Sequence, residues 1–448
     1  MTTDENIHQD GDQTTDSITE QGVDLTTGRL NYRLNVASGV ATQLAMNLTH
    51  PSLVLSVFVR SLGGSNALVG SLSAIRFGGW FLPQFFAAGW VQPLRRKTPL
   101  AVALELVRIV IYGLLGILTY VMGLSNPALL LIVFFVLFTI SRLVAGIGAL
   151  ARTDVIAKTI APNRRAAFFA LRNLLGQMVV FGAGFFVSYV LDDSPAWQFP
   201  ADFTLLFGVS TAVLVLALVL LSRVREPEGP AGLPHHSLRQ QLARAPALLR
   251  GDASLRRYLL VRVLLNMTRL SAPFYPILAL DVLSAPASMV GFYMSAMTLS
   301  GFVSNPFWQR MAQRRGNTYV VRAAALLTAT EPLAAIALPW LMRWGGYTVQ
   351  RYGLLPAYLF TIVFIIAGSA ESGRGIGLMT LMLDIAPEHE RASYVGLVNT
   401  ALGIISFLPI LAGAIIDRTG FEPIFAFAAV LLLGGYVVTL GWNQTEEP

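Results

Sequence analysis

Long apolar runs separated by short polar or basic stretches dominate the chain from about residue 34 onward. None of them alternates apolar and polar positions as a half-exposed β-strand would. Each is long enough to form a helix across a bilayer core of about 30 Å at 1.5 Å per residue. The pattern predicts twelve transmembrane helices, at about 34–59, 66–91, 99–123, 127–151, 167–191, 203–222, 258–281, 286–309, 318–342, 354–382, 392–416 and 421–441.

Polar stretches at the ends and near the middle divide the chain into domains. Residues 1–28 are polar and acidic, which predicts a disordered cytoplasmic tail rather than a cleaved signal peptide. Residues 223–257 are basic and rich in Pro and Gly, which predicts a cytoplasmic linker. Between these stretches we expect six-helix bundles at 29–222 and 258–442, followed by a short cytoplasmic tail at 443–448.

A repeated sequence relates the two halves. SRLVAGIGA at 141–149 aligns with AESGRGIGL at 370–378 at an offset of 229 residues, and a motif that begins Ile-Ala-Pro and continues to an arginine recurs at an offset of 226 residues. Two related halves around a site at the membrane midplane are typical of secondary transporters. The glycines and arginines that mark these repeats are Gly146, Gly148, Gly375, Gly377, Arg165 and Arg391.

Composition supports a membrane protein and excludes other classes. Hydrophobic residues make up 54% of the chain and charged residues 13%, against about 25% charged residues in an ordinary soluble domain. The net charge of +7 comes largely from basic residues in short loops, which is an orientation signal rather than a nucleic-acid-binding face. Their asymmetry predicts a multi-pass protein of the cytoplasmic (inner) membrane with both termini in the cytoplasm. The chain has no cysteine, so disulfides and thiolate metal sites are excluded.

Charged residues inside the apolar runs are candidate functional groups, because each costs roughly 2.5–3.5 kcal/mol at the centre of a membrane helix. The repeat places Arg142 opposite Glu371, so the two halves carry opposite charges at equivalent positions. Segments 1 and 7 carry polar groups beside prolines at matching depth, as a substrate site in a broken helix requires. The residues predicted to line a substrate or proton pathway are Arg142, Glu371, Arg374, Glu331, His50, Asn47, Arg269, Asn266 and Tyr275.

Several of these residues also have a purely structural interpretation. Glu371 with Arg374, and Glu105 with Arg108, are spaced three residues apart on a helix and can neutralise one another. His50 is either a histidine satisfied by its neighbours in the bundle or a proton carrier, since imidazole titrates near neutral pH. Both interpretations stay open for these residues.

Other polar and small residues predict structure rather than chemistry. Arg76 and Arg172, near the starts of segments 2 and 5, are predicted to snorkel or to support loops. Gly146 and Gly148 also fit close helix packing. The sequence has no metal-ligand spacing among its five histidines, no phosphate-binding glycine loop with lysine and no nucleophile elbow. It therefore predicts neither an enzyme nor a cofactor or metal.

The residues from Arg142 to Ala149 fit the pattern R-x-x-x-G-x-G-A. Together with the predicted helices in two halves, this pattern resembles the segment-4 signature of the major facilitator superfamily, over about residues 30–442. The resemblance implies an all-α membrane fold of twelve transmembrane helices in two pseudo-symmetric six-helix bundles. It also implicates Arg142 in proton coupling.

The loop between segments 2 and 3 departs from that family's pattern. The family's signature combines a glycine, an acidic residue and a basic cluster, whereas this chain keeps Gly89 with Arg95 and Arg96 and has no aspartate. A closer copy, from Gly413 to Asp417, lies at the outer end of segment 11. Segment 5 lacks the Gly-Pro pair that marks the family's antiporters, so the resemblance does not imply export by proton exchange.

Two functional hypotheses follow. The first is a secondary active transporter that moves a small organic solute by alternating access, with Arg142 and Glu371 in proton coupling. Its partners would be the lipid bilayer, the solute and protons, with no nucleic acid, and it would act as a monomer. The second is a membrane-embedded binding or assembly factor of the same fold without transport, which the loop signature without aspartate suggests. Anions, zwitterions and amphipathic drugs all remain candidate ligands.

Overall fold

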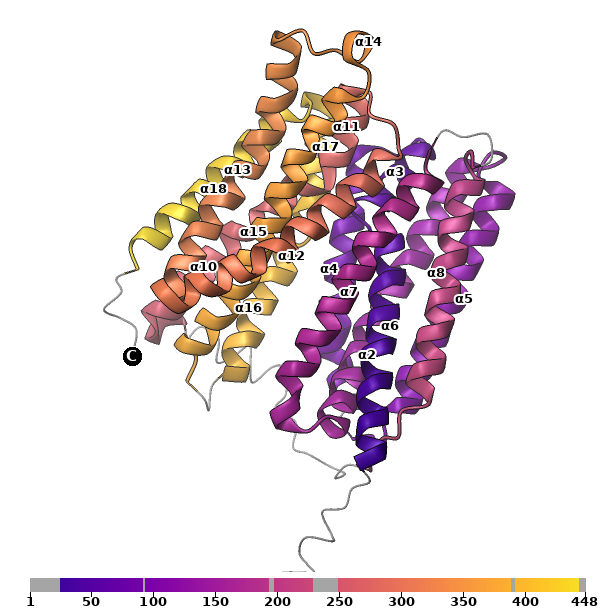
Figure 1. Ribbon diagram of the computed structural model, residues 1–448, viewed down its shortest axis with the longest axis vertical. Coiled ribbons are helices and arrows are strands. Elements are labelled where there is room, and N and C mark those ends of the chain that lie inside the picture. The colour runs from indigo at the N-terminus through magenta and orange to yellow at the C-terminus, as the bar shows by residue number, and fades with distance from the viewer. Residues whose placement is uncertain (1–24, 92, 193–196, 229–248, 388–390, 443–448) are drawn as a thin grey trace, which may run out of the picture.

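The structure is a computed structural model that describes residues 25–91, 93–192, 197–228, 249–387 and 391–442. Most of the predicted acidic tail and of the predicted linker lies outside these residues. Helices cover every apolar run predicted from the sequence, in the part of the chain that is described (Figure 1). This confirms the all-α fold class.

The first half forms seven helices because the first predicted segment is divided in two. They are α2 (Leu25–Leu48), α3 (Val54–Ser61), α4 (Asn66–Val91), α5 (Thr98–Met122), α6 (Pro127–Thr159), α7 (Pro162–Val190) and α8 (Ala201–Ser222). Helix α2 begins at Leu25, a few residues before the predicted start of the bundle, and the helices of this half otherwise follow the apolar runs.

The second half is divided more often. Its elements are α10 (Ala253–Leu265), the 3₁₀ turns η1 (Asn266–Leu270) and η2 (Ala272–Phe274), α11 (Tyr275–Leu283), α12 (Met289–Arg315), α13 (Asn317–Trp344), α14 (Val349–Tyr352), α15 (Leu355–Ile385), α16 (Arg391–Ile405), α17 (Leu408–Thr419) and α18 (Glu422–Leu440). The short α14 lies in a loop, and the other elements fall within the predicted segments or extend them.

Nine of the described helical segments are long and apolar enough to cross a membrane, with α10 to α11 counted as one segment and α16 to α17 as another. Helices α2, α4 and α12 lie in the remaining predicted runs. The chain is therefore a multi-pass membrane protein, and twelve crossings remain the prediction from sequence.

The first segment of each half is broken at a proline. Helix α2 ends before Pro51, whose ring and missing N–H prevent the helix from continuing. The carbonyl oxygen of His50 then accepts hydrogen bonds from the backbone N–H groups of Leu53, Val54 and Leu55 at 3.2, 2.9 and 3.0 Å, which starts α3. In the second half, η1 and η2 replace the α-helix around Pro273. The broken helices predicted in segments 1 and 7 are confirmed.

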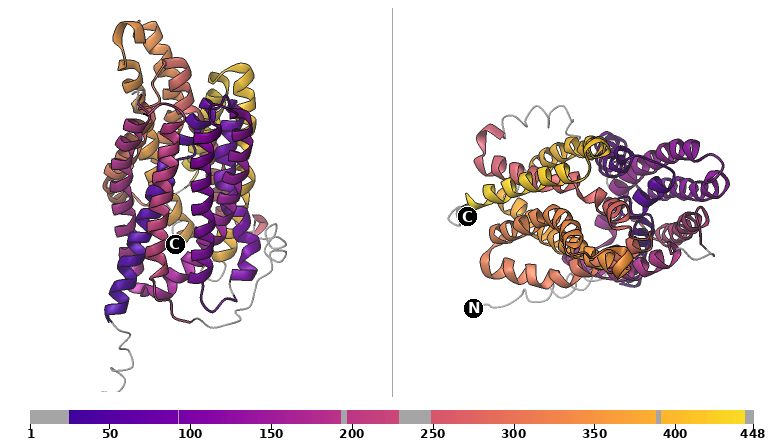
Figure 2. Two further views of the ribbon diagram at one scale, coloured as in Figure 1. Left: turned by 90° about the vertical axis from the view of Figure 1, so that its right-hand side faces the viewer. Right: turned by 90° about the horizontal axis from the view of Figure 1, so that it is seen from above.

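The two halves lie side by side, with α7 packed against α12 and α4 packed against α17 (Figure 2). We call the end that carries α3 and α11 the upper end, and the end at which α2 and α7 begin the lower end (Figure 1). Small residues permit the close approach. A Cβ on Gly184 would lie 2.0 Å from Ser295 Oγ, and a Cβ on Gly70 would lie 2.0 Å from the carbonyl oxygen of Pro409.

Polar contacts join the halves at the upper end. Asp417 accepts hydrogen bonds from the backbone N–H groups of Asn66 (2.9 Å) and Ala67 (3.1 Å) and from Asn66 Nδ2 (2.9 Å). Its carboxylate thus caps the N-terminus of α4, where free N–H groups and the helix dipole favour negative charge. Arg60 of α3 also forms an ion pair with Asp281 of α11 at 2.6 Å.

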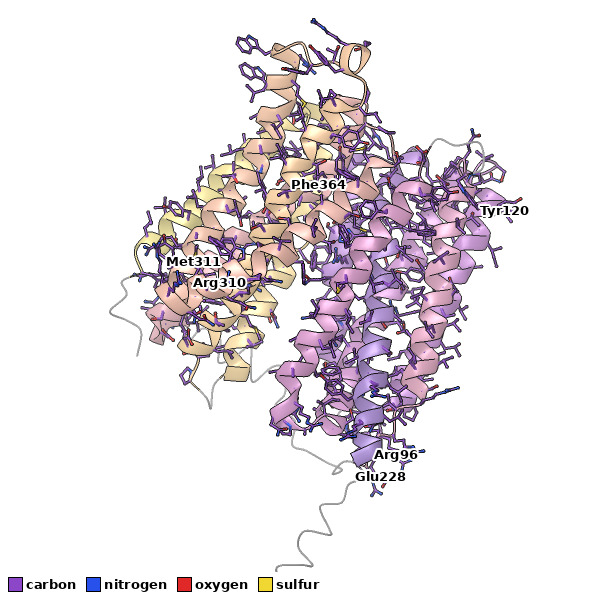
Figure 3. All side chains as sticks on the ribbon, in the orientation of Figure 1. Arg96, Tyr120, Glu228, Arg310, Met311 and Phe364 are labelled. Atoms are coloured by element: carbon purple, nitrogen blue, oxygen red, sulfur yellow. The ribbon has the colours of Figure 1, made fainter. Side chains whose placement is uncertain are left out.

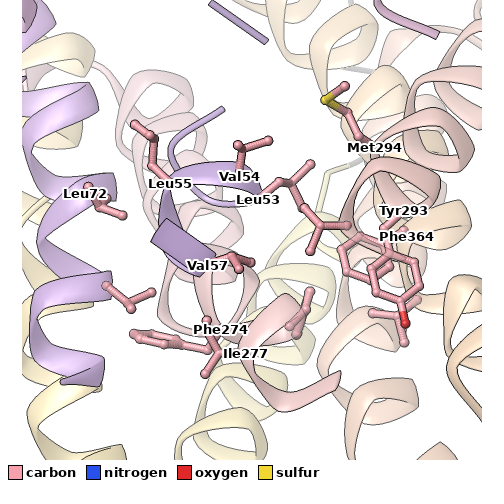
Figure 4. Close-up of a cluster of buried hydrophobic side chains, with 14 of the residues drawn as sticks. Leu53, Val54, Leu55, Val57, Leu72, Phe274, Ile277, Tyr293, Met294 and Phe364 are labelled. Atoms are coloured by element: carbon pink, nitrogen blue, oxygen red, sulfur yellow. The ribbon is translucent and has the colours of Figure 1, made fainter. Parts of the chain in front are cut away.

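Apolar side chains of both halves form one buried cluster near these contacts (Figure 4). Leu53 and Val57 come from α3 and the residues before it, whereas Phe274, Ile277 and Tyr293 come from the second half. All five are buried, with at most 3% of their surface exposed. Burial of this apolar surface stabilises the contact between the halves and excludes water there.

At the lower end, Glu226 joins three elements of the first half. Its carboxylate accepts hydrogen bonds from the backbone N–H groups of Lys97 and Thr98, both at 2.7 Å, and from Thr98 Oγ1 and Lys158 Nζ, both at 2.8 Å. Burial alone would raise the pKa of Glu226, but the hydrogen bonds from Lys158, Thr98 and Lys97 outweigh it and hold the pKa below its usual value. Lys97 also pairs with Asp154 of α6.

Candidate functional site

Three charged residues form a group in the first half, in which Glu105 and Arg108 are buried and Arg152 is partly buried. The Glu105 carboxylate of α5 accepts from Arg108 Nη1 at 2.9 Å and from Arg152 Nη2 of α6 at 2.7 Å. Arg152 Nη1 also donates to Thr42 Oγ1 of α2 at 3.1 Å. The group therefore ties α2, α5 and α6 together. The predicted Glu105–Arg108 pair is present, and the structure adds Arg152, which the sequence analysis did not select.

Arg142 lies deep in the first half, with 5% of its surface exposed. Its Nη2 donates to the hydroxyl oxygen of Tyr112 at 2.5 Å, and its guanidinium carbon lies 5.0 Å from the centre of the Phe138 ring. Its Nε is buried without a hydrogen-bond partner. Arg142 thus has a phenol and an aromatic face as neighbours, but no carboxylate within ion-pair distance among the described residues.

His50 and Arg76 meet at the break between α2 and α3. Arg76 Nη1 of α4 lies 2.9 Å from His50 Nε2. Since a guanidinium only donates, His50 Nε2 must accept, so the ring proton lies on Nδ1 and the imidazole is neutral. His50 Nδ1 is buried without a partner. Arg76 was predicted to snorkel or to support a loop, and it lies inside α4 with its side chain bonded to His50, which belongs to the turn between α2 and α3.

The second half carries a group with the opposite balance of charge. Arg374 of α15 lies 3.5 Å from Glu331 Oε1 and 3.7 Å from Glu371 Oε2, and its Nη1 donates to Thr328 Oγ1 at 3.0 Å. Thr268 Oγ1 of η1 donates to Glu331 Oε2 at 3.0 Å. Glu331 is buried, whereas 82% of the Glu371 side chain is exposed. Arg374 therefore links one buried and one accessible carboxylate.

Glu371 faces the first half although it lies on α15. Its charge interacts electrostatically with Arg76 of α4 and with Arg269 and Arg262 of the second half. Because Glu371 is both exposed and within electrostatic range of α4, the two halves do not close over it at this depth. The structure forms no ion pair between Glu371 and Arg142, the residue opposite it in the repeat, as far as the described residues go.

Arg269 is the arginine of η1 that reaches the other half. Its guanidinium carbon lies 3.7 Å from the centre of the Phe77 ring of α4. Its Nη1 is buried without a hydrogen-bond partner. Arg262 of α10 likewise has a buried Nε without a partner. The break in the second half thus directs a cation toward the first half, as the pattern of segment 7 predicted.

The remaining predicted pathway residues bond locally. Asn47 Nδ2 donates to the carbonyl oxygen of Gln43 at 2.8 Å, and Asn266 Nδ2 donates to the carbonyl oxygen of Arg262 at 2.7 Å. The Tyr275 hydroxyl lies 2.8 Å from Ser271 Oγ and is buried. These three side chains lie near the breaks, and their role in a pathway stays a prediction.

Two of the four signature glycines allow close packing. A Cβ on Gly146 would lie 2.6 Å from the carbonyl oxygen of Trp80, and one on Gly377 would lie 2.9 Å from Val321 Cγ2. A Cβ on Gly148 would meet only ordinary contacts, and one on Gly375 would meet nothing within 4 Å. The packing interpretation therefore accounts for one glycine of each repeat.

The basic signature residues lie at the lower end. Arg96 pairs with Glu228 at 3.3 Å, and both side chains are exposed there (Figure 3). The carbonyl oxygen of Arg95 accepts from Lys158 Nζ at 2.8 Å. Arg165 Nη2 donates to the carbonyl oxygen of Ala157 at 2.6 Å, which satisfies the end of α6. Gly89 lies in α4 and Arg391 begins α16, but the surroundings of both residues are outside what the structure describes.

No group of three or more His, Cys, Asp or Glu side chains that could hold a metal ion occurs in the described part of the chain. Sequence reasoning missed Arg76, Arg152 and Tyr112 as members of the site. Their only sequence signal is polarity within apolar runs, which does not identify partners on other helices. The site is therefore a set of arginines, carboxylates and polar groups drawn from both halves.

Comparisons with known proteins agree with this architecture. The sequence model of the Major Facilitator Superfamily matches residues 259–448. No curated protein matches the chain in sequence. A bacterial homologue of the iron transporter ferroportin, solved in an inward-facing state, has a TM-score of 0.68 and 14% identity, with 93% of this chain and 98% of that chain covered.

Two further solved structures share the fold. The nucleoside transporter NupG has a TM-score of 0.69 and 12% identity, with 92% of this chain and 99% of that chain covered. A D-xylose–proton symporter has a TM-score of 0.62 and 13% identity, with 94% of this chain and 97% of that chain covered. The second half of the chain thus matches the sequence model of the Major Facilitator Superfamily, and the chain shares the fold of these transporters over nearly its whole length.

Proposed function

We propose that the chain is a secondary active transporter that moves a small organic solute by alternating access. The observation that carries the proposal is the position of Glu371 and Arg269, which come from one half and interact electrostatically or in direct contact with residues of α4 in the other. A solute bound between such groups contacts both halves. Rocking of the halves would then expose the solute to one side of the membrane and afterwards to the other.

The two halves are joined at the upper end, and this arrangement supports a state of the transport cycle that is closed at that end. At the upper end the halves are joined by the Asp417 cap, the Arg60–Asp281 pair and buried apolar side chains. At mid-depth, Glu371 is exposed. We propose that the protein lies in the inner membrane and that its lower end, where Arg96 and Lys158 lie, faces the cytoplasm. This orientation agrees with the positive-inside rule. The solute site would then be open to the cytoplasm.

Proton coupling through Glu371 is part of the proposal. Glu371 is an exposed carboxylate whose charge acts on arginines of both halves, so it is the residue to which we assign this role. A Glu371→Gln variant should lose its response to an imposed pH gradient while still exchanging solute. Full retention of the response to the pH gradient would remove Glu371 from the coupling mechanism.

Transport can be tested by measuring solute flux in liposomes that contain a variant whose upper end can be cross-linked. The sequence has no cysteine, so Arg60→Cys with Asp281→Cys introduces the only two thiols. A short cleavable reagent that joins them would hold the upper end closed. Liposomes loaded with a cell extract should lose at least one solute faster than protein-free liposomes, as measured by mass spectrometry.

The cross-linked variant should lose this flux, and cleavage of the reagent should restore it. The same double variant before cross-linking is the matched control. Equal flux with and without the cross-link would contradict alternating access. If no solute leaves faster than from protein-free liposomes, transport is contradicted and a binding or assembly factor is favoured instead.

A further inference from the structure

Two arginines from opposite halves meet at one aromatic ring. The guanidinium carbon of Arg269 lies 3.7 Å from the centre of the Phe77 ring, and that of Arg76 lies 5.3 Å from it. The charges of the two arginines act on each other. Two like charges held at one ring repel, so this arrangement is unfavourable unless a negative group lies near both.

Neither arginine has a carboxylate within ion-pair distance in the described part of the chain. The hydrogen bond of Arg76 goes to a neutral imidazole, that of His50. Arg269 Nη1 is buried and has no hydrogen-bond partner at all. The guanidinium groups are thus held by an aromatic face and a neutral ring, and their hydrogen-bonding capacity is incompletely used.

The nearest carboxylates are already engaged or only partly available. Glu105 binds both Arg108 and Arg152, and Glu331 accepts from Thr268 and lies beside Arg374. Glu371 interacts with the two arginines at long range while it lies 3.7 Å from Arg374. Arg142 and Arg262 add two further cations that form no ion pair with any described residue. The interior therefore carries more positive than negative charge.

We infer that the transported solute is a small organic anion, whose carboxylate or phosphate group binds between Arg76 and Arg269. Guanidinium groups bind such oxyanions through paired N–H donors, and Arg269 Nη1 is a free donor at this place. The anion would pair directly with two cations that form no ion pair in the described residues, and it would touch both halves. Transport of the anion rests on the proposed function, whereas its binding can be tested separately.

The binding test uses purified protein in nanodiscs of zwitterionic lipid, at low chloride concentration. The probes are succinate and glycerol 3-phosphate, with succinamide and glycerol as neutral partners of similar size. A ligand that binds the folded state raises the apparent unfolding temperature with increasing concentration. We expect at least one anion to do so, and its neutral partner to have no effect.

The variants Arg76→Gln and Arg269→Gln should weaken that effect by about tenfold or more, because each removes a charged hydrogen-bond donor. Without ligand, Arg269→Gln should unfold at the same temperature as the wild type or above it, since the substitution removes an uncompensated charge. Arg269→Lys keeps the charge and should bind with intermediate affinity. Arg343→Gln, at an exposed arginine of the upper end, is the matched control and should bind as the wild type does.

Three results would overturn the inference. The first is stabilisation by the neutral partners alone, and the second is equal anion binding by Arg269→Gln and the wild type. The third is stabilisation only after phosphatidylglycerol is added, which would assign the arginines to a lipid headgroup. Solute flux that is restricted to neutral or cationic compounds would contradict the anion inference but would support the proposed transporter. Anion binding without any solute flux would support the anion inference and contradict the proposed transporter.

Discussion

The two halves use buried charge in opposite ways. In the first half one carboxylate, Glu105, is shared by two arginines, of which Arg108 is buried with it and Arg152 is partly buried. In the second half one arginine, Arg374, is shared by two carboxylates, of which Glu371 is 82% exposed. The first arrangement is closed, because Glu105 is held by Arg108 on its own helix, α5, and by Arg152 on the neighbouring helix α6. The second is open, because Glu371 can change partner without any helix moving.

This difference separates a structural role from a functional one. Spacing in sequence is the same for Glu105–Arg108 and Glu371–Arg374, and it left both pairs with two interpretations. Burial and a third partner favour the structural interpretation of the first pair. Exposure and the charges of Arg76 and Arg269 nearby leave the second pair available for a solute or a proton.

The largest expected effect comes from breaking the closed group. Glu105→Gln removes the carboxylate that Arg108 and Arg152 share and leaves one buried and one partly buried cation without their ion pair. We expect a loss of about 3–5 kcal/mol, as for other buried ion pairs from which one partner is removed. The measurement is the apparent unfolding temperature of the purified protein, together with its yield of folded material by size exclusion.

Glu371→Gln is the matched control for that substitution. It removes a carboxylate at the same spacing from its arginine, but one that is exposed, so the loss should be about 1 kcal/mol or less. Equal losses of stability in the two variants would contradict the division between a closed and an open group.

An intermediate effect is expected where the second half caps a helix of the first. Asp417→Asn weakens the cap at the N-terminus of α4, which is worth about 1 kcal/mol. Because the cap joins the halves at the upper end, its loss should favour states in which that end is open, by about fivefold. Spin labels on Ser61→Cys and Ser284→Cys, one in each half, should then report a larger population of long distances.

The variant Asp281→Asn serves as a comparison for Asp417→Asn. It breaks the partly exposed ion pair with Arg60, which also joins the halves but is screened by solvent. Its effect on the distance distribution should be smaller than that of Asp417→Asn and should vanish at high salt. An unchanged distribution in Asp417→Asn would show that the apolar cluster alone keeps the upper end closed.

Local chemistry explains what the sequence predicted well. The apolar runs, the breaks at Pro51 and Pro273 and the i,i+3 pair of Glu105 with Arg108 each depend on residues close together in the chain. The repeat placed Arg142 inside the first half, and the structure finds it buried. These features need no knowledge of how one helix packs on another.

Contacts between helices explain what the sequence could not predict. Arg152 reaches Glu105 from α6, and Arg269 reaches Phe77 from the other half. Arg76 lies ten residues, or roughly 15 Å, into α4 and bonds to His50 in the turn between α2 and α3, a partner that the sequence of α4 does not reveal. A polar residue within an apolar run indicates a free-energy cost of burial, but only the packing of the helices shows which partner offsets that cost.

The smallest effect that we predict is a difference between Glu226 and Asp417 in how each affects the pH dependence of the unfolding temperature. Glu226 stabilises the first half internally, and its pKa in the folded protein lies below the usual 4.5. Its contribution is therefore complete above about pH 4.5 and is lost as the pH falls through the lower pKa of the folded state. The wild type should lose unfolding temperature over that acidic range, and Glu226→Gln should lose less. Asp417→Asn should keep the slope of the wild type, because Glu226 and its partners Lys97, Thr98 and Lys158 are unchanged; a flattened slope in that variant would mean that the two ends are coupled.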